Sequence, residues 1–281
     1  MFPIYRTPQS KPILMKEYEQ ILKLWPQPCE RHTIHTDQGD TFVMSSGTPD
    51  GTPVILLHGS TTNAALWLYD SATLGETRHV YAVDIIGEPG LSADVRPAFD
   101  AGVYAHWLSQ VMDGLGIEKA AFAGNSMGGW MALEAATHMP DRVSALILLA
   151  PAGLAHVRRS FFVRLIPKLL IGKRGAHSLN HLLFGSAKVP KEAFSYAELL
   201  RKHYNPRPLK FPIFTDDQIT ALKMPVLFIG GEIDPLLPTK KGAERLRRLL
   251  PDADVRIAPG LSHTIIDMAG EMKVFLDKHG I

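Results

Sequence analysis

The chain alternates between short runs of apolar residues and longer amphipathic stretches. Three runs, at residues 54–59, 79–87 and 143–153, are almost continuously apolar and bounded by turn residues, which is typical of strands buried on both faces. Helix-like patterns at residues 101–116 and 127–138 lie between these runs. This alternation predicts an α/β fold with a mostly parallel central sheet and helices on both of its faces.

The start of the chain has weaker patterns. Residues 15–26 predict an amphipathic helix that ends before a pair of prolines. Residues 31–37 and 41–47 alternate well enough to predict the two strands of a hairpin. Residues 64–72 predict a short helix, and residues 119–124 predict a further buried strand.

The alternation of strands and helices stops after residue 153. Residues 154–222 contain no comparable strand run, and several prolines interrupt them. The expected elements that follow are a strand at 224–234, a helix at 239–250, a strand at 254–260 and a helix from about residue 264. We therefore expect a single domain over residues 1–281. Its core would comprise about residues 30–153 and 223–281, with a helical cap inserted at about residues 154–222.

Composition narrows the class of protein. Hydrophobic residues make up 46% of the 281 residues, which is enough for a sizeable core. The net charge of +2 gives no signature of nucleic-acid binding, and the apolar runs are too short to insert stably into a membrane. A single cysteine, Cys29, and the lack of a signal-peptide pattern favour the cytoplasm.

A serine lies between glycines at one predicted junction. Gly124, Ser126 and Gly128 form a G-x-S-x-G pattern where the strand at 119–124 gives way to the helix at 127–138. The chain turns so sharply in this motif that larger flanking side chains would clash, and the helix N-terminus favours negative charge beside the hydroxyl. The pattern predicts a nucleophilic serine. The alternative is an ordinary turn in which Ser126 caps the helix.

A serine nucleophile needs a base, and the base needs an orienting carboxylate. His263 follows the last predicted strand and Asp234 follows the strand before it. The carboxyl ends of parallel strands meet at one edge of the sheet, so we expect both residues to lie near Ser126. Glu232 is the first alternative to Asp234, and a packed or surface histidine is the alternative for His263.

The first central strand ends in His58 and Gly59, at the same edge of the sheet. The backbone N–H groups of Ser60 and Met127 are expected to point at the negative charge that develops on a reacting carbonyl oxygen. One such donor typically contributes about 10²–10³ in rate. The alternative is an ordinary turn from strand to loop.

Together these elements resemble the α/β-hydrolase superfamily, and in particular its serine carboxylesterase-like members. The likeness covers about residues 40–153 and 224–280. The segment VDIIGEPGLS is similar to the family's stretch after its fourth strand, and GGEIDPLLP is similar to its acid turn.

The resemblance implies an α/β-hydrolase fold and a Ser126–His263–Asp234 triad. It also implies an oxyanion hole formed by Ser60 and Met127, and ester hydrolysis through an acyl-enzyme, with no cofactor or metal. The expected substrate is therefore a small-molecule ester.

Other members of the superfamily remain alternatives. The stretch GNSMGG resembles the nucleophile turn of meta-cleavage C–C bond hydrolases, but HGSTTNAALW lacks their Gly-Pro-Gly run and no tryptophan follows His263. Haloalkane dehalogenases and epoxide hydrolases carry an aspartate where Ser126 stands, which argues against both of these classes. A cofactor-free haloperoxidase or perhydrolase would use the same triad, and a ligand receptor could share the fold without catalysis.

The expected cap is strongly basic. Residues 154–214 contain two acids, Glu192 and Glu198, and twelve cations: Arg158, Arg159, Arg164, Lys168, Lys173, Arg174, Lys188, Lys191, Arg201, Lys202, Arg207 and Lys210. The segment thus carries about +10 and the remainder about −8. The first interpretation is a cap helix whose cations face water. The alternatives are cations that steer an anionic ester into the cleft, or that dock the cap on an anionic membrane surface as for a lipid-like ester.

Overall fold

The computed structural model describes residues 3–281 except 101, 171, 186, 188 and 209. The strands are β1 (Cys29–Thr36), β2 (Gly39–Gly47), β3 (Thr52–Leu57), β4 (Arg78–Val83), β5 (Ala120–Asn125), β6 (Val143–Leu149), β7 (Val226–Gly231) and β8 (Asp254–Ala258). The helices are α1 (Ser10–Leu22), α2 (Leu68–Gly75), α3 (Val103–Gly114), α4 (Met127–His138), α5 (Arg159–Leu170), α6 (Gly172–Phe184), α7 (Lys191–His203), α8 (Asp216–Thr220), α9 (Thr239–Leu249) and α10 (Ala269–Lys278). Two short 3₁₀ segments, η1 (Ala64–Trp67) and η2 (Pro140–Arg142), precede α2 and β6.

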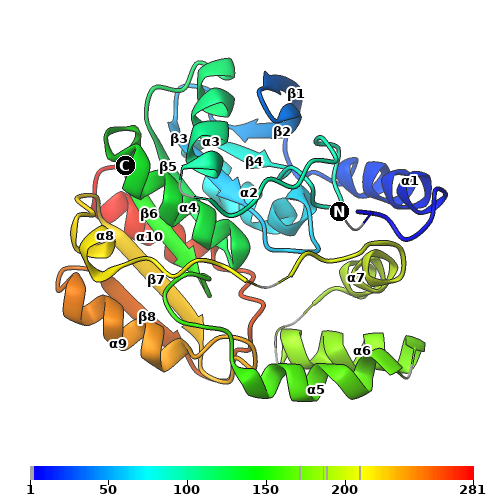
Figure 1. Ribbon diagram of the computed structural model, residues 1–281. Coiled ribbons are helices and arrows are strands. Elements are labelled where there is room, and N and C mark those ends of the chain that lie inside the picture. Colours follow the sequence, from blue (N-terminus) through cyan, green and yellow to red (C-terminus); the bar gives the residue numbers. More distant parts are fainter. Residues whose placement is uncertain (1–2, 101, 171, 186, 188, 209) are drawn as a thin grey trace.

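All eight strands form one sheet with the order β1-β2-β4-β3-β5-β6-β7-β8 (Figure 1). The pairs β1–β2 and β2–β4 are antiparallel, and every pair from β4 to β8 is parallel. The expectation of a mostly parallel sheet in an α/β-hydrolase fold is therefore confirmed. The parallel strands bring their carboxyl ends to one edge.

The apolar strand runs follow from burial on both faces of the sheet. In β3, Val54 and Leu56 pack on the side of α1, α2 and α10, whereas Ile55 and Leu57 pack on the side of α3, α4 and α9. All four side chains are fully buried. Burying one such side chain stabilises the fold by about 1.5–3 kcal/mol. A polar residue on either face of β3 would therefore lower the stability of the protein.

The N-terminal helix lies further upstream than the sequence pattern indicates. It spans Ser10–Leu22, whereas the expected range was 15–26. Pro12 is accommodated because the first N–H groups of a helix have no intrahelical acceptor. The chain leaves the helix early because Trp25 turns inward and its indole N–H donates to the Ser46 hydroxyl at 2.9 Å.

The last helix begins at Ala269, so the expected start at about residue 264 was wrong. The carboxylate of Asp70 accepts the N–H groups of Met268 (3.0 Å) and Ala269 (2.9 Å) and thereby caps the helix start. Just before it, Asp267 has a φ of 59°, which a continuing helix does not allow. The residues between His263 and this cap form a loop.

Helices α5–α8 all lie in the connection between β6 and β7. Figure 1 shows α5 and α6 side by side at one end of the molecule, with α7 beside α1. Phe161 of α5 and Leu179 of α6 pack on Leu236 and Leu237, which follow β7. The connection therefore contacts the core close to the carboxyl ends of the strands. Within the described residues, no helix has both the length and the hydropathy needed to cross a membrane.

Candidate active site

Ser126 occupies a strained turn between β5 and α4. Its φ of 52° and ψ of −107° lie in a region that non-glycine residues rarely adopt. The turn is held from both sides: the Ser126 N–H donates to Leu149 O at 2.9 Å, and the Ser126 carbonyl accepts from Trp130 N (3.1 Å) and Ala152 N (3.0 Å). The half-buried Ser126 side chain therefore projects from a rigid backbone.

The flanking glycines are required by close approach of backbone to backbone. A Cβ on Gly124 would lie 2.3 Å from the carbonyl oxygen of Gly128. A Cβ on Gly128 would lie 2.1 Å from Leu57 O, at the end of β3. Because both obstacles are main-chain atoms, no side-chain movement could relieve them. The start of α4 thus packs directly on the end of β3.

The side chains of Ser126, His263 and Asp234 form a hydrogen-bonded chain. His263 Nε2 lies 3.0 Å from Ser126 Oγ, and His263 Nδ1 lies 2.8 Å from Asp234 Oδ2. An ionised carboxylate can only accept, so Nδ1 carries the proton and Nε2 is free to accept from the serine hydroxyl. The residues come from the ends of β5 and β7 and from the loop after β8.

Asp234 is 3% exposed, and its other carboxylate oxygen accepts the N–H groups of Leu236 (2.7 Å) and Leu237 (2.9 Å). Burial by itself would raise the pKa of this carboxyl. The adjacent His263 and the two backbone donors outweigh burial and hold the pKa of Asp234 below its ordinary value. Glu232, the alternative to Asp234, is exposed and instead accepts the N–H of Gly260 at 3.2 Å, which places it outside the hydrogen-bonded chain.

Ser60 and Met127 lie on either side of the serine turn. A Cβ on Gly59 would lie 3.6 Å from Ser126 Cβ, so the loop after β3 passes directly beside the serine. Met127 is the first residue of α4, where an N–H group has no intrahelical acceptor. Within the described part of the chain, neither the Ser60 N–H nor the Met127 N–H donates to a protein acceptor.

His58 fixes the peptide that carries the Ser60 N–H. Its Nε2 accepts from Ile85 N at 2.9 Å, so its Nδ1 carries the proton and donates to Gly59 O at 2.8 Å. The Thr62 hydroxyl donates to the same oxygen at 2.8 Å. The Gly59 carbonyl and the Ser60 N–H share one planar peptide, so fixing the oxygen also fixes the direction of the N–H. Complete burial lowers the pKa of His58 to about 4, which keeps the ring neutral.

The structure adds residues that the sequence patterns did not indicate. The Asn125 amide donates to Ile265 O at 3.1 Å and joins the serine turn to the histidine loop. The Ser262 hydroxyl donates to Leu182 O (2.8 Å) and the Thr264 N–H donates to Leu183 O (2.9 Å), both at the end of α6. His263 is thus held from the core on one side and from α6 on the other.

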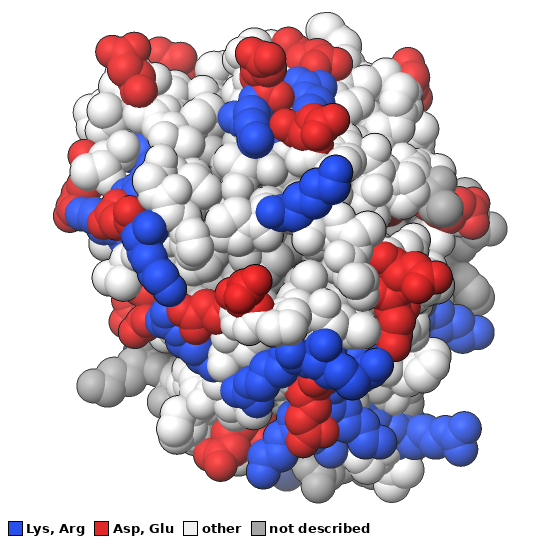
Figure 2. Space-filling view, turned by 90° about the vertical axis from the view of Figure 1, so that its left-hand side faces the viewer, with Lys and Arg blue, Asp and Glu red and all other residues white. Residues whose placement is uncertain are grey.

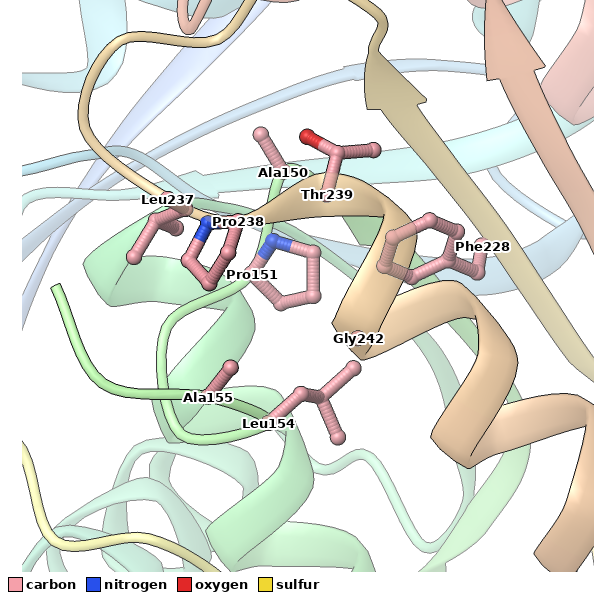
Figure 3. A pocket seen from close by; sticks show the side chains of 9 residues that line it. All are labelled: Ala150, Pro151, Leu154, Ala155, Phe228, Leu237, Pro238, Thr239 and Gly242. Carbon is pink, nitrogen blue, oxygen red and sulfur yellow. The ribbon is translucent and has the colours of Figure 1, made fainter. Parts of the chain in front are cut away.

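A pocket close to this site does not include the three side chains. Figure 3 shows its lining, which comprises Ala150, Pro151, Leu154, Ala155, Phe228, Leu237, Pro238, Thr239 and Gly242. The lining is almost entirely apolar, and the pocket lies between the end of β6 and the start of α9. It offers no group that could act on a substrate. Among the described residues, no cluster of three or more His, Cys, Asp or Glu side chains could hold a metal ion.

The sequence profile of the Alpha/beta hydrolase family matches residues 54–273. Two curated relatives come from Bacillus subtilis. An uncharacterized carboxylesterase, nap, is 28% identical over 257 residues, which cover 88% of this chain and 85% of that protein. The carboxylesterase YbfK is 28% identical over 262 residues, which cover 88% of this chain and 86% of that protein. The crystal structure of carboxylesterase CesB (YbfK) from the same organism superposes with a TM-score of 0.80, at 26% identity over 97% of both chains.

Proposed function

The chain belongs to the alpha/beta hydrolase family, and from that premise we propose that it is a carboxylesterase-like enzyme that cleaves carboxylic esters through an acyl-enzyme. In this proposal Ser126 is the nucleophile, His263 is the base and then the acid, and Asp234 orients the imidazole. The observation that supports the proposal most is the unbroken chain of hydrogen bonds from Ser126 Oγ through His263 to Asp234.

In the first half-reaction, Ser126 Oγ attacks the ester carbonyl carbon while its proton passes to His263 Nε2. The carbonyl oxygen becomes an oxyanion, which accepts hydrogen bonds from the N–H groups of Ser60 and Met127. Asp234 stabilises the imidazolium that forms without taking its proton. The tetrahedral intermediate collapses, the C–O bond to the alcohol breaks, and the alkoxide leaves with the proton from Nε2.

In the second half-reaction, a water molecule replaces the alcohol. His263 Nε2 takes a proton from the water, whose oxygen attacks the acyl carbon held on Ser126. The bond from the acyl carbon to Ser126 Oγ then breaks, and Ser126 recovers its proton from Nε2. The products are the carboxylic acid and the free enzyme.

Hydrolysis of p-nitrophenyl esters, from acetate to long acyl chains, tests this proposal. We expect turnover by the wild type and a loss of more than about 10⁴-fold in Ser126→Ala. Ser109→Ala is the matched control, because Ser109 lies on α3 and, among the described residues, its hydroxyl bonds only to the carbonyl of His106. Absence of ester turnover by the wild type would contradict the proposal and favour the C–C hydrolase or receptor alternatives.

We further propose that residues 154–222 act as a helical cap on a single-domain core. Support comes from the bonds of Ser262 and Thr264 to the end of α6 and from the packing of α5 and α6 on the loop after β7. The substrate would be a small ester with an anionic or lipid-like part. A cytoplasmic location stays a prediction.

Charge and exposure support the choice of substrate. On the face of the molecule that carries α8 and α9, Lys and Arg alternate with Asp and Glu (Figure 2), and Arg245 and Arg248 pair with Asp216 at 2.7 and 2.9 Å. By contrast, no described Lys or Arg of residues 154–214 lies within 4 Å of a carboxylate oxygen. In α5, Val163 and Ile166 are 71% and 58% exposed. The cap therefore carries cations that no described carboxylate neutralises at close range, and α5 also exposes apolar side chains.

Two measurements test the proposed substrate class. If cations steer an anionic ester, kcat/KM should fall as salt rises from about 0.01 to 0.5 M, because screening shortens the reach of the charges. If the ester is lipid-like, the enzyme should co-sediment with anionic but not with neutral vesicles. A flat salt dependence would exclude the first possibility, and equal sedimentation with both vesicles would exclude the second.

A further inference from the structure

Glu88 is a buried carboxylate beside the proposed oxyanion hole that has no part in the chemistry described above. It lies in the connection between β4 and α3 and is 1% exposed. Its Oε2 accepts the N–H of Thr61 at 2.7 Å, and the Ser60 hydroxyl lies 3.5 Å from the same oxygen. Its Oε1 is buried and has no hydrogen-bond partner among the described residues. Burying a carboxylate oxygen without a partner lowers the stability of the fold, so this carboxylate is expected to have a role that offsets the cost.

Thr61, the partner of Glu88, has an unfavourable backbone conformation. Its φ of 63° lies in the left-handed region, where a β-branched residue is strongly disfavoured. Conformations of this kind cost about 1–3 kcal/mol and persist only where neighbouring groups hold them. A hydrogen bond from a backbone N–H to a carboxylate is among the stronger ones available. Glu88 is therefore well placed to stabilise the turn at Thr61.

The turn at Thr61 supports the peptide that carries the Ser60 N–H. The peptide before Ser60 is held at its oxygen by His58 and Thr62, as described above. The peptide after Ser60 ends in the Thr61 N–H, for which Glu88 is the one acceptor in the described part of the chain. Thr62, whose hydroxyl holds the Gly59 oxygen, directly follows the turn at Thr61. Release of the second peptide would let Thr61 relax to a negative φ, which would draw the Thr62 hydroxyl off the Gly59 oxygen and loosen the peptide that carries the Ser60 N–H.

We propose that Glu88 is a positioning residue for the oxyanion hole, which it serves by accepting the Thr61 N–H and so aiming the Ser60 N–H at the reacting carbonyl oxygen. This inference rests on the proposed esterase function. What matters is an acceptor oxygen at the right place, since Glu88 touches neither Ser126 nor His263. Arg96, Arg207 and Tyr204 face the carboxylate, but no described cation lies within 4 Å of it.

Glu134 provides a matched control. It is also 1% exposed, it also accepts one backbone N–H (Gly102, 2.7 Å), and it also has one buried oxygen without a partner. Its acceptor bond, however, holds the start of α3 and not the loop beside Ser126. Removing either carboxylate should destabilise the fold, whereas only Glu88 should affect stabilisation of the oxyanion.

The test compares Glu88→Ala, Glu88→Gln and Glu134→Ala in hydrolysis of a p-nitrophenyl ester and in binding of phenylboronic acid. The boronic acid forms a tetrahedral adduct with the serine whose oxygen occupies the oxyanion position. In Glu88→Ala we expect kcat to fall 10- to 100-fold with KM changed less than threefold, and boronate affinity to fall in parallel. Glu88→Gln, which retains an acceptor oxygen, should stay within about threefold of wild type in both.

Glu134→Ala should unfold at a lower urea concentration but keep wild-type kcat and boronate affinity per folded molecule. If Glu88→Ala does not fold, Glu88→Asp takes its place, because its oxygen withdraws from the Thr61 N–H by about 1.5 Å, the length of one C–C bond. The same losses are then expected.

Equal effects of the Glu88 and Glu134 variants on kcat and boronate affinity would overturn the inference, as would wild-type values in Glu88→Ala. A loss in Glu88→Gln as large as that in Glu88→Ala would also overturn it. In those cases the wild type still hydrolyses the ester, so the proposed function stands. If the wild type neither hydrolyses the ester nor binds the boronic acid, the proposed function fails and this inference fails with it.

Discussion

Replacing Gly128 with alanine would place a methyl group against the main chain of β3. The added Cβ would lie 2.1 Å from Leu57 O and 2.7 Å from His58 O. A close carbon–oxygen contact is normally about 3.3 Å or longer, so α4 and β3 would have to separate by roughly 1 Å. That movement would carry the Met127 N–H, at the start of α4, away from the loop after β3 that contains Ser60.

Two costs follow from this displacement. Overpacking of a buried site of this kind costs about 1–3 kcal/mol of stability. A misplacement of about 1 Å among groups that stabilise a transition state costs about 10²-fold in rate, which corresponds to about 2.7 kcal/mol. We therefore expect Gly128→Ala to lower kcat/KM about 100-fold beyond any loss of folded protein.

Urea unfolding and p-nitrophenyl ester hydrolysis measure the two costs separately. Gly270→Ala is the control, because Gly270 is also the second residue of a helix, and a Cβ there meets nothing within 4 Å. It should raise stability by up to about 1 kcal/mol and leave kcat/KM unchanged. If Gly128→Ala retained wild-type stability and activity, the tight contact between α4 and β3 could not be what aligns the two N–H groups.

Three other substitutions have defined outcomes. Asp234→Asn should reduce kcat by about 10⁴-fold with little change in KM, because the amide donates to His263 Nδ1 and forces the wrong tautomer; a loss below tenfold would contradict the assigned orienting role. Asn125→Ala should remove the bond to Ile265 O and lower kcat about tenfold, and an unchanged kcat would show that the histidine loop does not need this bond. Burial raises the pKa of Glu134 from 4.5 to about 7, so its folded state favours the protonated form. Its contribution to stability is therefore lost as pH rises from about 4.5 to about 7, and Glu134→Gln should gain stability relative to wild type over that range in urea titrations at several pH values; parallel curves would contradict this.

The residues whose location could be predicted from the sequence are those that follow strands of the parallel sheet. Ser126 and Asp234 each follow a buried strand, and His263 follows the last strand, β8. The parallel sheet brings the carboxyl ends of these strands to one edge. The buried strands could be predicted because helices cover both faces of the sheet, so their sequences are almost continuously apolar. The structure places His263 within hydrogen-bond distance of both Ser126 and Asp234, and the catalytic roles of the three residues remain proposals.

The residues that the sequence could not place act through backbone groups far away in the chain. Asn125 bonds to a carbonyl 140 positions away, and Asp70 caps a helix 198 positions away. A backbone acceptor or donor has no sequence signature of its own. The start of α10 was wrongly predicted because its cap, Asp70, belongs to α2 and not to the local pattern.

The hydrogen bonds between the histidine loop and the end of α6 make the position of His263 depend on the position of α6. Ser262 and Thr264 flank His263, and both donate to carbonyls of α6. A movement of α6 away from the histidine loop would break these two bonds and leave His263 supported from the core side alone. If His263 acts as the general base, as proposed, the placement of α6 is therefore part of what holds that base for proton transfer.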